Sequence, residues 1–372
     1  MATNIPHYVR SQSTESLPPP VAERGVVGWL KRNLFSSIGN TILTLIALWL
    51  LWEIVPPILN WAFFSATFTG TDRASCDGAG ACWPFVNARF GQFVYGFYPV
   101  SQRWRVDAAV VVLLLAMVPL FLPRFERKLA YALGLLVVYP IVAYVLFLGG
   151  KFGLSHVETS RWGGLFLTLV IAGVGITTSL PLGVVLALGR RSTMPAIRMV
   201  CVVFIELVRG VPLITVLFMA SVMLPLFLPE GVNFDKLLRA LVGFSLFSAA
   251  YMAEVVRGGL QAIPKGQYEA AAALGLGYWK SMGLIILPQA LKIVIPGIVN
   301  TFIGLFKDTS LVLIIGLFDF LNTVQAGLSD PNWIGLAIEG YVFAAAVYWV
   351  FCFAMSRYSQ HLERKLDTGH KR

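Results

Sequence analysis

Charged residues are scarce in this chain of 372 residues: Asp, Glu, Lys and Arg make up 13% of it, whereas hydrophobic residues make up 57%. Ordinary soluble domains carry about 25% charged residues, because polar side chains must cover a surface that is in contact with water. A chain with so little charge cannot cover such a surface. The composition therefore excludes an ordinary soluble globular protein and favours a membrane protein.

Signatures of metal and phosphate binding are also missing. The four histidines lie in the tails or in a predicted outer loop, and no spacing of His and Cys is typical of a metal site. No G-x-x-x-x-G-K-[ST] run is present; the nearest stretch, 275–281, has Trp279 where the second Gly is required. The sequence therefore predicts no catalytic residue, no metal and no cofactor bound by this chain.

Apolar runs of the length that crosses a bilayer recur along the chain. In lipid each backbone amide must bond within its own segment, and runs without strand-like alternation favour helices. The sequence predicts an all-α polytopic membrane protein with eight transmembrane helices, at residues 38–59, 107–122, 129–148, 164–188, 197–228, 237–256, 284–306 and 335–355. A shorter apolar stretch, 311–321, is expected to enter the membrane part-way without crossing it.

The formal charge of +10 comes from Lys and Arg placed between the apolar runs, not gathered on one polar surface, so nucleic acid is not a predicted partner. Their bias to one side of the predicted topology places both termini in the cytoplasm. No cleavable signal peptide is predicted. The expected parts are a disordered tail (1–35), a three-span extension (36–150) with an outer loop (60–105), a five-span part (151–356) with a cytoplasmic loop (257–283), and a tail (357–372).

The four cysteines fall into two pairs. Cys76 and Cys82 lie in the predicted outer loop, on the oxidising side of the membrane, where either a disulfide or two free thiols would fit. Cys201 and Cys352 lie in apolar runs and are interpreted as packing residues.

The cytoplasmic loop contains a predicted short helix. An Ala-rich run at 267–274 has high helix propensity, begins after Pro264 and ends at Gly275, which suits a helix stop. The run is too short to span a bilayer. We expect it to lie under the membrane, with Tyr278 and Trp279 near the interface.

The same loop carries a motif: Glu-Ala-Ala, then Gly after three residues, then Ile-x-Leu-Pro after nine more. In this pattern the chain resembles the permeases of bacterial ABC importers. The resemblance implies that the loop helix docks in a groove of a cytoplasmic ABC ATPase dimer, which binds and hydrolyses ATP. A connector without a partner is the alternative interpretation. The predicted ATPase-coupling residues are Glu269, Ala270, Ala271, Gly275, Ile285, Leu287 and Pro288.

Further stretches narrow the resemblance. FIELVRGVPL (204–213), AYMAEVVRGGLQAIPKG (250–266) and LFKDTSL (305–311) are similar to the polar amino acid uptake subfamily, in a part with a type I importer permease core. The stretch 82–99 is similar to the longer permease of general L-amino acid importers. The resemblance implies a bacterial inner membrane location, a second and different permease subunit, and a periplasmic amino acid binding protein as partners.

Charged residues in or near lipid cost a few kcal/mol and are therefore candidates for function. Glu206 and Arg209 are three residues apart, so a structural ion pair is predicted between them. An amino acid substrate carries an ammonium and a carboxylate, so its path would need an acid and a donor. The predicted substrate-path residues are Glu254, Asn300, Thr301, Lys307 and Asp308.

For three of these residues a structural role stays open: Glu254 can pair with Arg257, and Asn300 and Thr301 can form helix-packing hydrogen bonds.

Two other functions compete with that of an importer subunit. An ion-coupled secondary transporter would need an internal repeat and an acid near mid-membrane, and no repeat is found. A membrane enzyme would need a paired nucleophile and base, which the spans do not contain.

Overall fold

The computed structural model describes residues 25–76, 78–122, 125–229 and 234–366. The predicted tail segments 1–24 and 367–372 therefore lie outside the described residues. The chain divides into two compact units: the first comprises residues up to Thr67 together with 77–81, and the second comprises 68–76 and the residues from Cys82 onward.

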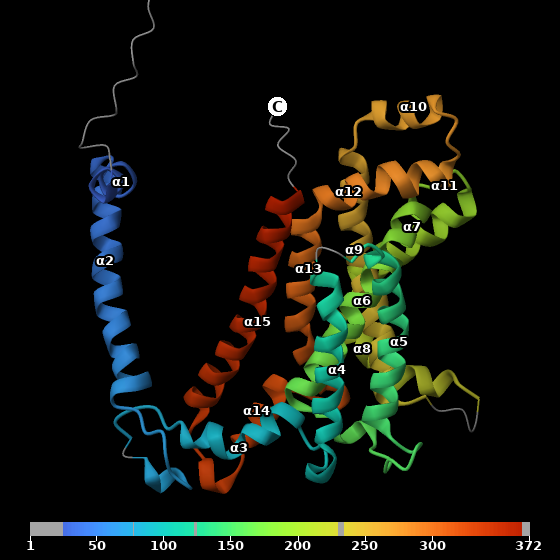
Figure 1. The fold of residues 1–372 in the computed structure, drawn as a ribbon. Helices are drawn as coiled ribbons and strands as arrows, with labels where there is room; N and C mark the ends of the chain where they lie inside the picture. Colours follow the sequence, from blue (N-terminus) through green and yellow to red (C-terminus); the bar gives the residue numbers. More distant parts are fainter. Residues whose placement is uncertain (1–24, 77, 123–124, 230–233, 367–372) are drawn as a thin grey trace, which may run out of the picture. The chain divides into compact units, whose positions relative to one another are not determined.

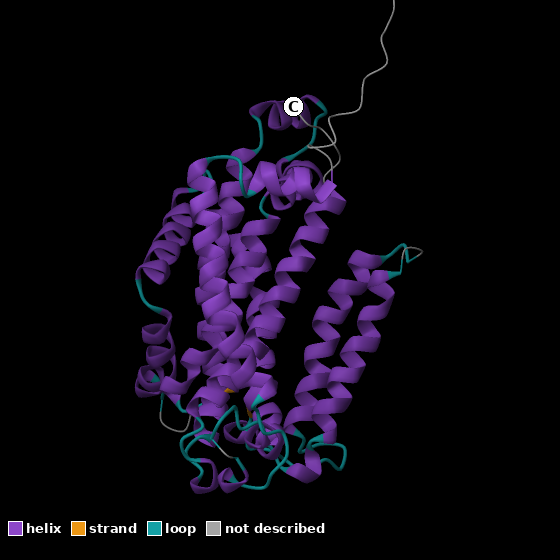
Figure 2. Ribbon diagram, turned by 90° about the vertical axis from the view of Figure 1, so that its left-hand side faces the viewer, coloured by secondary structure: helices purple, strands orange, loops and turns teal. Residues whose placement is uncertain are grey.

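The described residues form helices and one two-residue strand (Figures 1 and 2). In chain order they are α1 (Gly25–Asn33), α2 (Ile38–Leu59), η2 (Asn60–Phe64), η3 (Arg73–Ser75), α3 (Pro84–Tyr95), η4 (Val100–Gln102), α4 (Trp104–Phe121), α5 (Lys128–Leu148), η5 (Thr159–Arg161), α6 (Gly164–Arg190), α7 (Pro195–Gly210), α8 (Leu213–Phe218), η6 (Met219–Met223), η7 (Leu224–Phe227), α9 (Lys236–Ala262), α10 (Lys265–Ala273), α11 (Tyr278–Ser281), η8 (Met282–Ile286), α12 (Leu287–Ile293), α13 (Ile295–Asp308), η9 (Thr309–Ile315), β1 (Phe318–Asp319), α14 (Phe320–Gly327), η10 (Pro331–Trp333) and α15 (Ala337–Leu366).

The first unit contains α1 and α2. The Ser37 side chain accepts a hydrogen bond from the Asn40 amide and caps α2, and the Thr44 hydroxyl donates to the Leu34 carbonyl at 2.8 Å. Residues 25–33, which we expected to be disordered as part of the tail 1–35, form α1. Lys31 and Arg32 in its last turn favour this helix because they complement the helix dipole.

Helices α6 and α9, of 27 residues each, form the centre of the second unit. They approach closely at Gly183, where a Cβ atom would lie 2.7 Å from the Cβ of Met252. The face of α9 that is buried is rich in small residues, among them Ala249, Ala250 and Ala253. Small side chains let two helices pack closely where lipid gives no hydrophobic drive for association.

The prediction of eight spans is confirmed in number when a bent pair counts as one. Among the described residues seven helices are long and apolar enough to cross a membrane, and an eighth candidate joins 195–210 to 213–227 with a bend of 106°. The fifth span, expected to run unbroken over 197–228, is thus broken. Val211 is extended (φ −113°, ψ 137°) because it precedes Pro212, which disfavours a helical residue before it.

The seventh span is also shifted relative to the sequence prediction. We expected it at 284–306, whereas the candidate span is 295–315. Pro288 lacks an amide hydrogen and follows the π-helix η8, and the chain turns at Val294 before Pro296. Figure 1 shows α12 at an angle to α13. The prolines thus separate α12 from the candidate span, which begins at Ile295.

The stretch 311–321 is broken into three pieces. Its first residues end the seventh candidate span as η9, Gly316 then turns the chain with φ +73°, and β1 follows. Phe318 and Asp319 of this strand bridge in parallel to Gly163 and Gly164. The remaining residues begin α14.

Helices α4 and α5 belong to the second unit, so the structure divides the predicted extension 36–150 at Thr67. One buried apolar cluster joins Val106 of α4, Phe147 of α5 and Phe166 of α6. The Tyr98 hydroxyl donates to the Phe147 carbonyl at 2.7 Å. These contacts make α4 and α5 continuous with the core that follows them in sequence.

Candidate functional site

The loop helix α10 lies at one end of the helices of the second unit. Figure 1 shows it beyond the ends of α9 and α12, whereas α3 and α14 lie at the opposite end of the same unit. The predicted coupling helix and the segment with the two outer cysteines are therefore separated by the length of the spans.

Helix α10 ends as the sequence predicts. Gly275 adopts φ +72°, its amide donates to the Ala272 carbonyl at 2.9 Å, and the Leu276 amide donates to the Ala271 carbonyl at 3.2 Å. These two bonds form a Schellman motif, which needs a residue in the left-handed region and so favours glycine. A Cβ atom at Gly275 would meet no atom of this chain within 4 Å, so the glycine serves the backbone conformation.

The seven motif residues divide into two groups. Glu269, Ala270 and Gly275 are exposed, and the neighbouring Leu274 is 74% exposed. By contrast Ala271 is buried, and the remaining three residues lie on η8 and α12, where Ile285 and Leu287 pack against a buried apolar cluster. The first group can contact a partner, and the second attaches the loop to the spans.

An ion-pair network joins α6, α7 and α9. The Arg190 guanidinium lies 2.8 Å from both Glu206 and Glu254, and Arg257 lies 2.8 Å from the second Glu254 oxygen. Arg209 lies 3.8 Å from Glu254. We call these five residues the inner ion-pair network; it holds three positive and two negative charges.

This network corrects the predicted pair of Glu206 and Arg209. The two residues share a helix, but Arg190 and Glu254 reach them from other helices. Glu254, the predicted acid for a substrate ammonium, is only 15% exposed in its side chain and already faces three guanidinium groups. The alternative role for Glu254, an ion pair with Arg257, is present in the structure.

The other predicted substrate-path residues lie on α13, Asn300 and Thr301 near its middle and Lys307 and Asp308 at its end. Asn300 and Lys307 are exposed and, seven residues apart, share one face of the helix, whereas Asp308 is half-buried and follows Lys307 round the helix. Thr301 instead donates to the Gly297 carbonyl at 2.9 Å. The structure thus places Asn300 and Lys307 on one exposed face of α13, and the Thr301 hydroxyl bonds to its own helix.

Sequence reasoning missed a buried acid, Asp319. It is fully buried and accepts hydrogen bonds from the amides of Leu321 and Asn322, from the Asn322 side chain and from the Tyr348 hydroxyl. Burial raises the pKa of the Asp319 carboxyl, and bonds from Asn322, Tyr348 and Leu321 oppose the shift. An Asp directly before a helix was the available signal, since it is a preferred N-cap.

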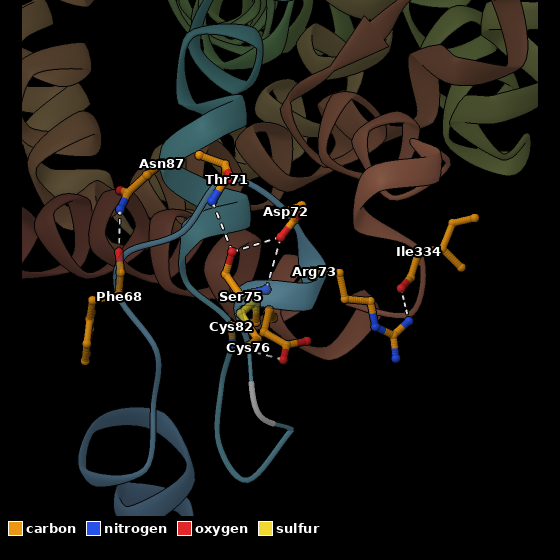
Figure 3. Close-up of a disulfide and its surroundings, with 10 residues drawn as sticks. Phe68, Thr71, Asp72, Arg73, Ser75, Cys76, Cys82, Asn87 and Ile334 are labelled. Atoms are coloured by element: carbon orange, nitrogen blue, oxygen red, sulfur yellow. Dashed lines mark hydrogen bonds between the residues drawn. A yellow bond between two sulfur atoms is a disulfide. The ribbon is translucent and has the colours of Figure 1, made fainter.

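At the opposite end from α10, Cys76 and Cys82 form a disulfide with Cα atoms 5.8 Å apart (Figure 3). The Cys82 amide donates to Glu339 Oε1 at 3.3 Å, and Arg73 donates to the Ile334 carbonyl. These bonds attach the segment before α3 to the start of α15. Cys201 and Cys352 are free.

Among the described residues no group of three or more His, Cys, Asp or Glu is arranged to hold a metal ion. Helix α10 itself is mostly exposed, and the residues that follow it pack on a buried apolar cluster of the spans.

Comparison with known proteins agrees with this geometry. Residues 179–368 match the family model "Binding-protein-dependent transport system inner membrane component". The Escherichia coli (strain K12) "Inner membrane amino-acid ABC transporter permease protein YhdY" is 60% identical over 92% of this chain and 93% of its own length. The "Glutamate/glutamine/aspartate/asparagine transport system permease protein BztC" of Rhodobacter capsulatus is 40% identical over 98% of this chain and 99% of its own.

A shorter relative matches only part of this chain. The "Glutamate/aspartate import permease protein GltK" of Escherichia coli O157:H7 is 36% identical over 91% of its length, which corresponds to only 54% of this chain. The prediction of an all-α polytopic protein with an importer permease core is confirmed, and the chain is a membrane permease subunit, not an enzyme. By its matched residues and its near full-length relatives, the chain belongs to the family of inner membrane components of binding-protein-dependent transport systems.

Proposed function

We propose that this permease subunit forms part of the path of an ATP-driven importer of amino acids in a bacterial inner membrane. The names of YhdY and BztC, both similar over more than nine-tenths of this chain, support amino acids as the substrate class. The proposed partners are a cytoplasmic ABC ATPase dimer that binds the ATP, a second and different permease subunit, a periplasmic binding protein and the surrounding lipid.

The observation that carries the proposal is the geometry of α10. Nine residues form a helix on which Glu269 and Ala270 are exposed, and exposed Leu274 follows directly after it. Small side chains permit close approach of a partner, and Glu269 supplies a charge for contact. A partner that presses on this helix would move the anchored residues Ile285 and Leu287 with it.

For orientation, we place α10 and both termini in the cytoplasm and the disulfide outside. The Lys and Arg distribution supports this placement. The disulfide, which persists in oxidising compartments, supports it from the other end.

For the substrate path, we assign Asn300, Lys307 and Asp308 of α13. These groups offer both a cation and an anion for a zwitterion. We assign Glu254 and Thr301 to structural roles, because the first faces three arginines and the second bonds its own helix.

The test is reconstitution of the subunit with its ATPase, second permease and binding protein in proteoliposomes. We expect uptake of labelled L-amino acids that requires ATP, and loss of uptake when Gly275 is replaced by Val although the protein still inserts. The matched control is Gly277→Val, because Gly277 has φ −66° and equally open surroundings. Uptake that ignores ATP and follows an ion gradient would refute the proposal; this ion-coupled alternative is not favoured by the family assignment.

A further inference from the structure

Helix α10 has little packing to hold its orientation. Of its nine residues only Ala271 is buried, and a cavity of about 350 Å³ lies beside it, lined in part by Leu188, Ala272 and Met282. Pro264 precedes the helix, and Gly275 and Gly277 follow it. A force on α10 could therefore be lost in rotation of the helix about its two ends.

The Arg191 side chain connects α10 to α6 and α9. Arg191, directly after α6, donates to the Tyr268 hydroxyl of α10 at 3.1 Å and to the Leu260 carbonyl of α9 at 3.2 Å. The Tyr268 hydroxyl in turn donates to the same carbonyl at 3.1 Å. The Arg191 guanidinium also lies 5.7 Å from the centre of the Tyr268 ring. These bonds close a triangle between three helices.

The position of Leu260 explains why the triangle is stable. Its carbonyl lies in the last turn of α9, where carbonyl groups have no amide partner within the helix. The residue is only 1% exposed, so its carbonyl needs donors from elsewhere, and Arg191 and Tyr268 provide them. A second, separate link runs from Gln289 of α12 to Gln267 of α10 at 3.2 Å.

We propose that Arg191 is a positioning residue of the transport cycle: it fixes the orientation of α10 on α6 and α9, so that displacement of α10 moves the spans. Because α6 and α9 pack closely at Gly183 and Met252, a displacement delivered at their common end moves both helices. This inference rests on the proposed function, in which α10 receives the stroke of the ATPase.

The experiment uses the complete importer in proteoliposomes, with Arg191→Met in this subunit. The readout is the number of amino acid molecules imported per ATP hydrolysed, together with the amount of ATPase that co-purifies. We expect the import ratio to fall about 2- to 10-fold, the range that loss of one typical net hydrogen bond implies, while co-purification stays unchanged. Arg198→Met is the matched control, because Arg198 makes no side-chain hydrogen bond or ion pair within the described part of the chain.

Three further variants separate positioning from folding. Tyr268→Phe keeps the ring and removes the hydroxyl, so we expect a smaller fall in the import ratio. Because both side chains act through one triangle, the double variant should fall no further than Arg191→Met alone. Arg191→Lys, which retains a donor, should restore part of the ratio.

The inference is overturned if Arg191→Met and Tyr268→Phe leave the import ratio at the wild-type value. It is equally overturned if ATP hydrolysis, import and recovery of the complex fall together, because that is the result of a purely structural role. Absence of ATP-driven uptake by the wild-type importer would instead overturn the proposed function, and this inference with it.

Discussion

Arg190 at the end of α6 and Glu254 in α9 lie 2.8 Å apart, and the same guanidinium reaches Glu206 of α7 at 2.8 Å. Helix α7 buries only Ile205 completely, and the inner ion-pair network adds polar contacts from α7 to α6 and α9. Glu254 is the centre of this network because it faces three of the five charges. The attachment of α7 should therefore depend on charge more than that of its neighbours.

The first prediction concerns Glu254→Gln. The change leaves three arginines close together with only Glu206 to neutralise them, and removal of one partner of a buried pair costs about 3 to 5 kcal/mol. Since Arg209 and Arg257 are partly exposed, we expect about 2 kcal/mol of destabilisation. The measurement is the midpoint of thermal unfolding of the purified subunit in detergent. Glu206→Gln is the control: its side chain is 55% exposed, so its midpoint should shift much less. Equal shifts would contradict the central position of Glu254.

A second prediction concerns the contact of α6 with α9. Gly183→Leu introduces a side chain where a Cβ alone would lie 2.7 Å from Met252 and 3.1 Å from the Ala253 backbone nitrogen. Overpacking of this kind costs about 1 to 3 kcal/mol, and we expect a lower unfolding midpoint together with reduced uptake.

Gly173 on the same helix provides the matched control, because a Cβ there would meet nothing within 4 Å. Gly173→Leu should leave the unfolding midpoint of the subunit near the wild-type value. If the two substitutions have the same effect, glycine at 183 is not needed for close packing of the helices.

How much of the fold the sequence predicts depends on what decides each feature. The spans follow from apolar runs alone, and α10 follows from helix propensity together with Gly275. The bend before Pro212 and the shifted start of the seventh span do not follow, because a proline in a transmembrane segment can kink a helix or break it. Which of these happens depends on neighbouring helices.

The candidate site shows the same division. The exposed coupling residues are local, so one motif identifies them. The partners of Glu206 and Arg209 cannot be read from the spacing within α7: spacing places both residues on one face of α7, but Arg190 and Glu254 come from two other helices, α6 and α9. The triangle of Arg191, Tyr268 and Leu260 could not be predicted for the same reason.

A third prediction concerns alkaline pH at the end of α3. Burial, then the hydrogen bond to Asp107 at 2.6 Å and the charge of that carboxylate, raise the pKa of Tyr95 from 10.0 to about 12, and the Arg103 guanidinium opposes the shift. The folded chain therefore keeps this proton where the unfolded chain loses it. The stabilisation is complete below pH 10 and is lost as the pH rises through about 12.

The measurement is the unfolding midpoint of the subunit as a function of pH. Between pH 10 and about 12 we expect the unfolding midpoint of the wild type to fall more steeply than that of Tyr95→Phe. The control is Tyr278→Phe, at a tyrosine that is 50% exposed, and it should follow the wild-type profile. A Tyr95→Phe profile as steep as the wild-type profile would contradict the assignment.

The last prediction concerns the disulfide at the opposite end from α10. Cys76 and Cys82 are six residues apart in sequence, and closing so short a loop restricts the unfolded chain by about 2 kcal/mol. The Cys82 amide also donates a hydrogen bond to Glu339 of α15. We therefore expect Cys76→Ser with Cys82→Ser to lower the unfolding midpoint and to make the 68–82 segment more sensitive to protease added from the outside.

Dithiothreitol should likewise lower the unfolding midpoint and raise the protease sensitivity of the wild-type protein, and it should have no further effect on the double variant. The matched control, Cys201→Ser with Cys352→Ser, removes the two free thiols and should respond to dithiothreitol as the wild type does. A double variant at 76 and 82 that still responds to the reductant would show that another group carries the effect.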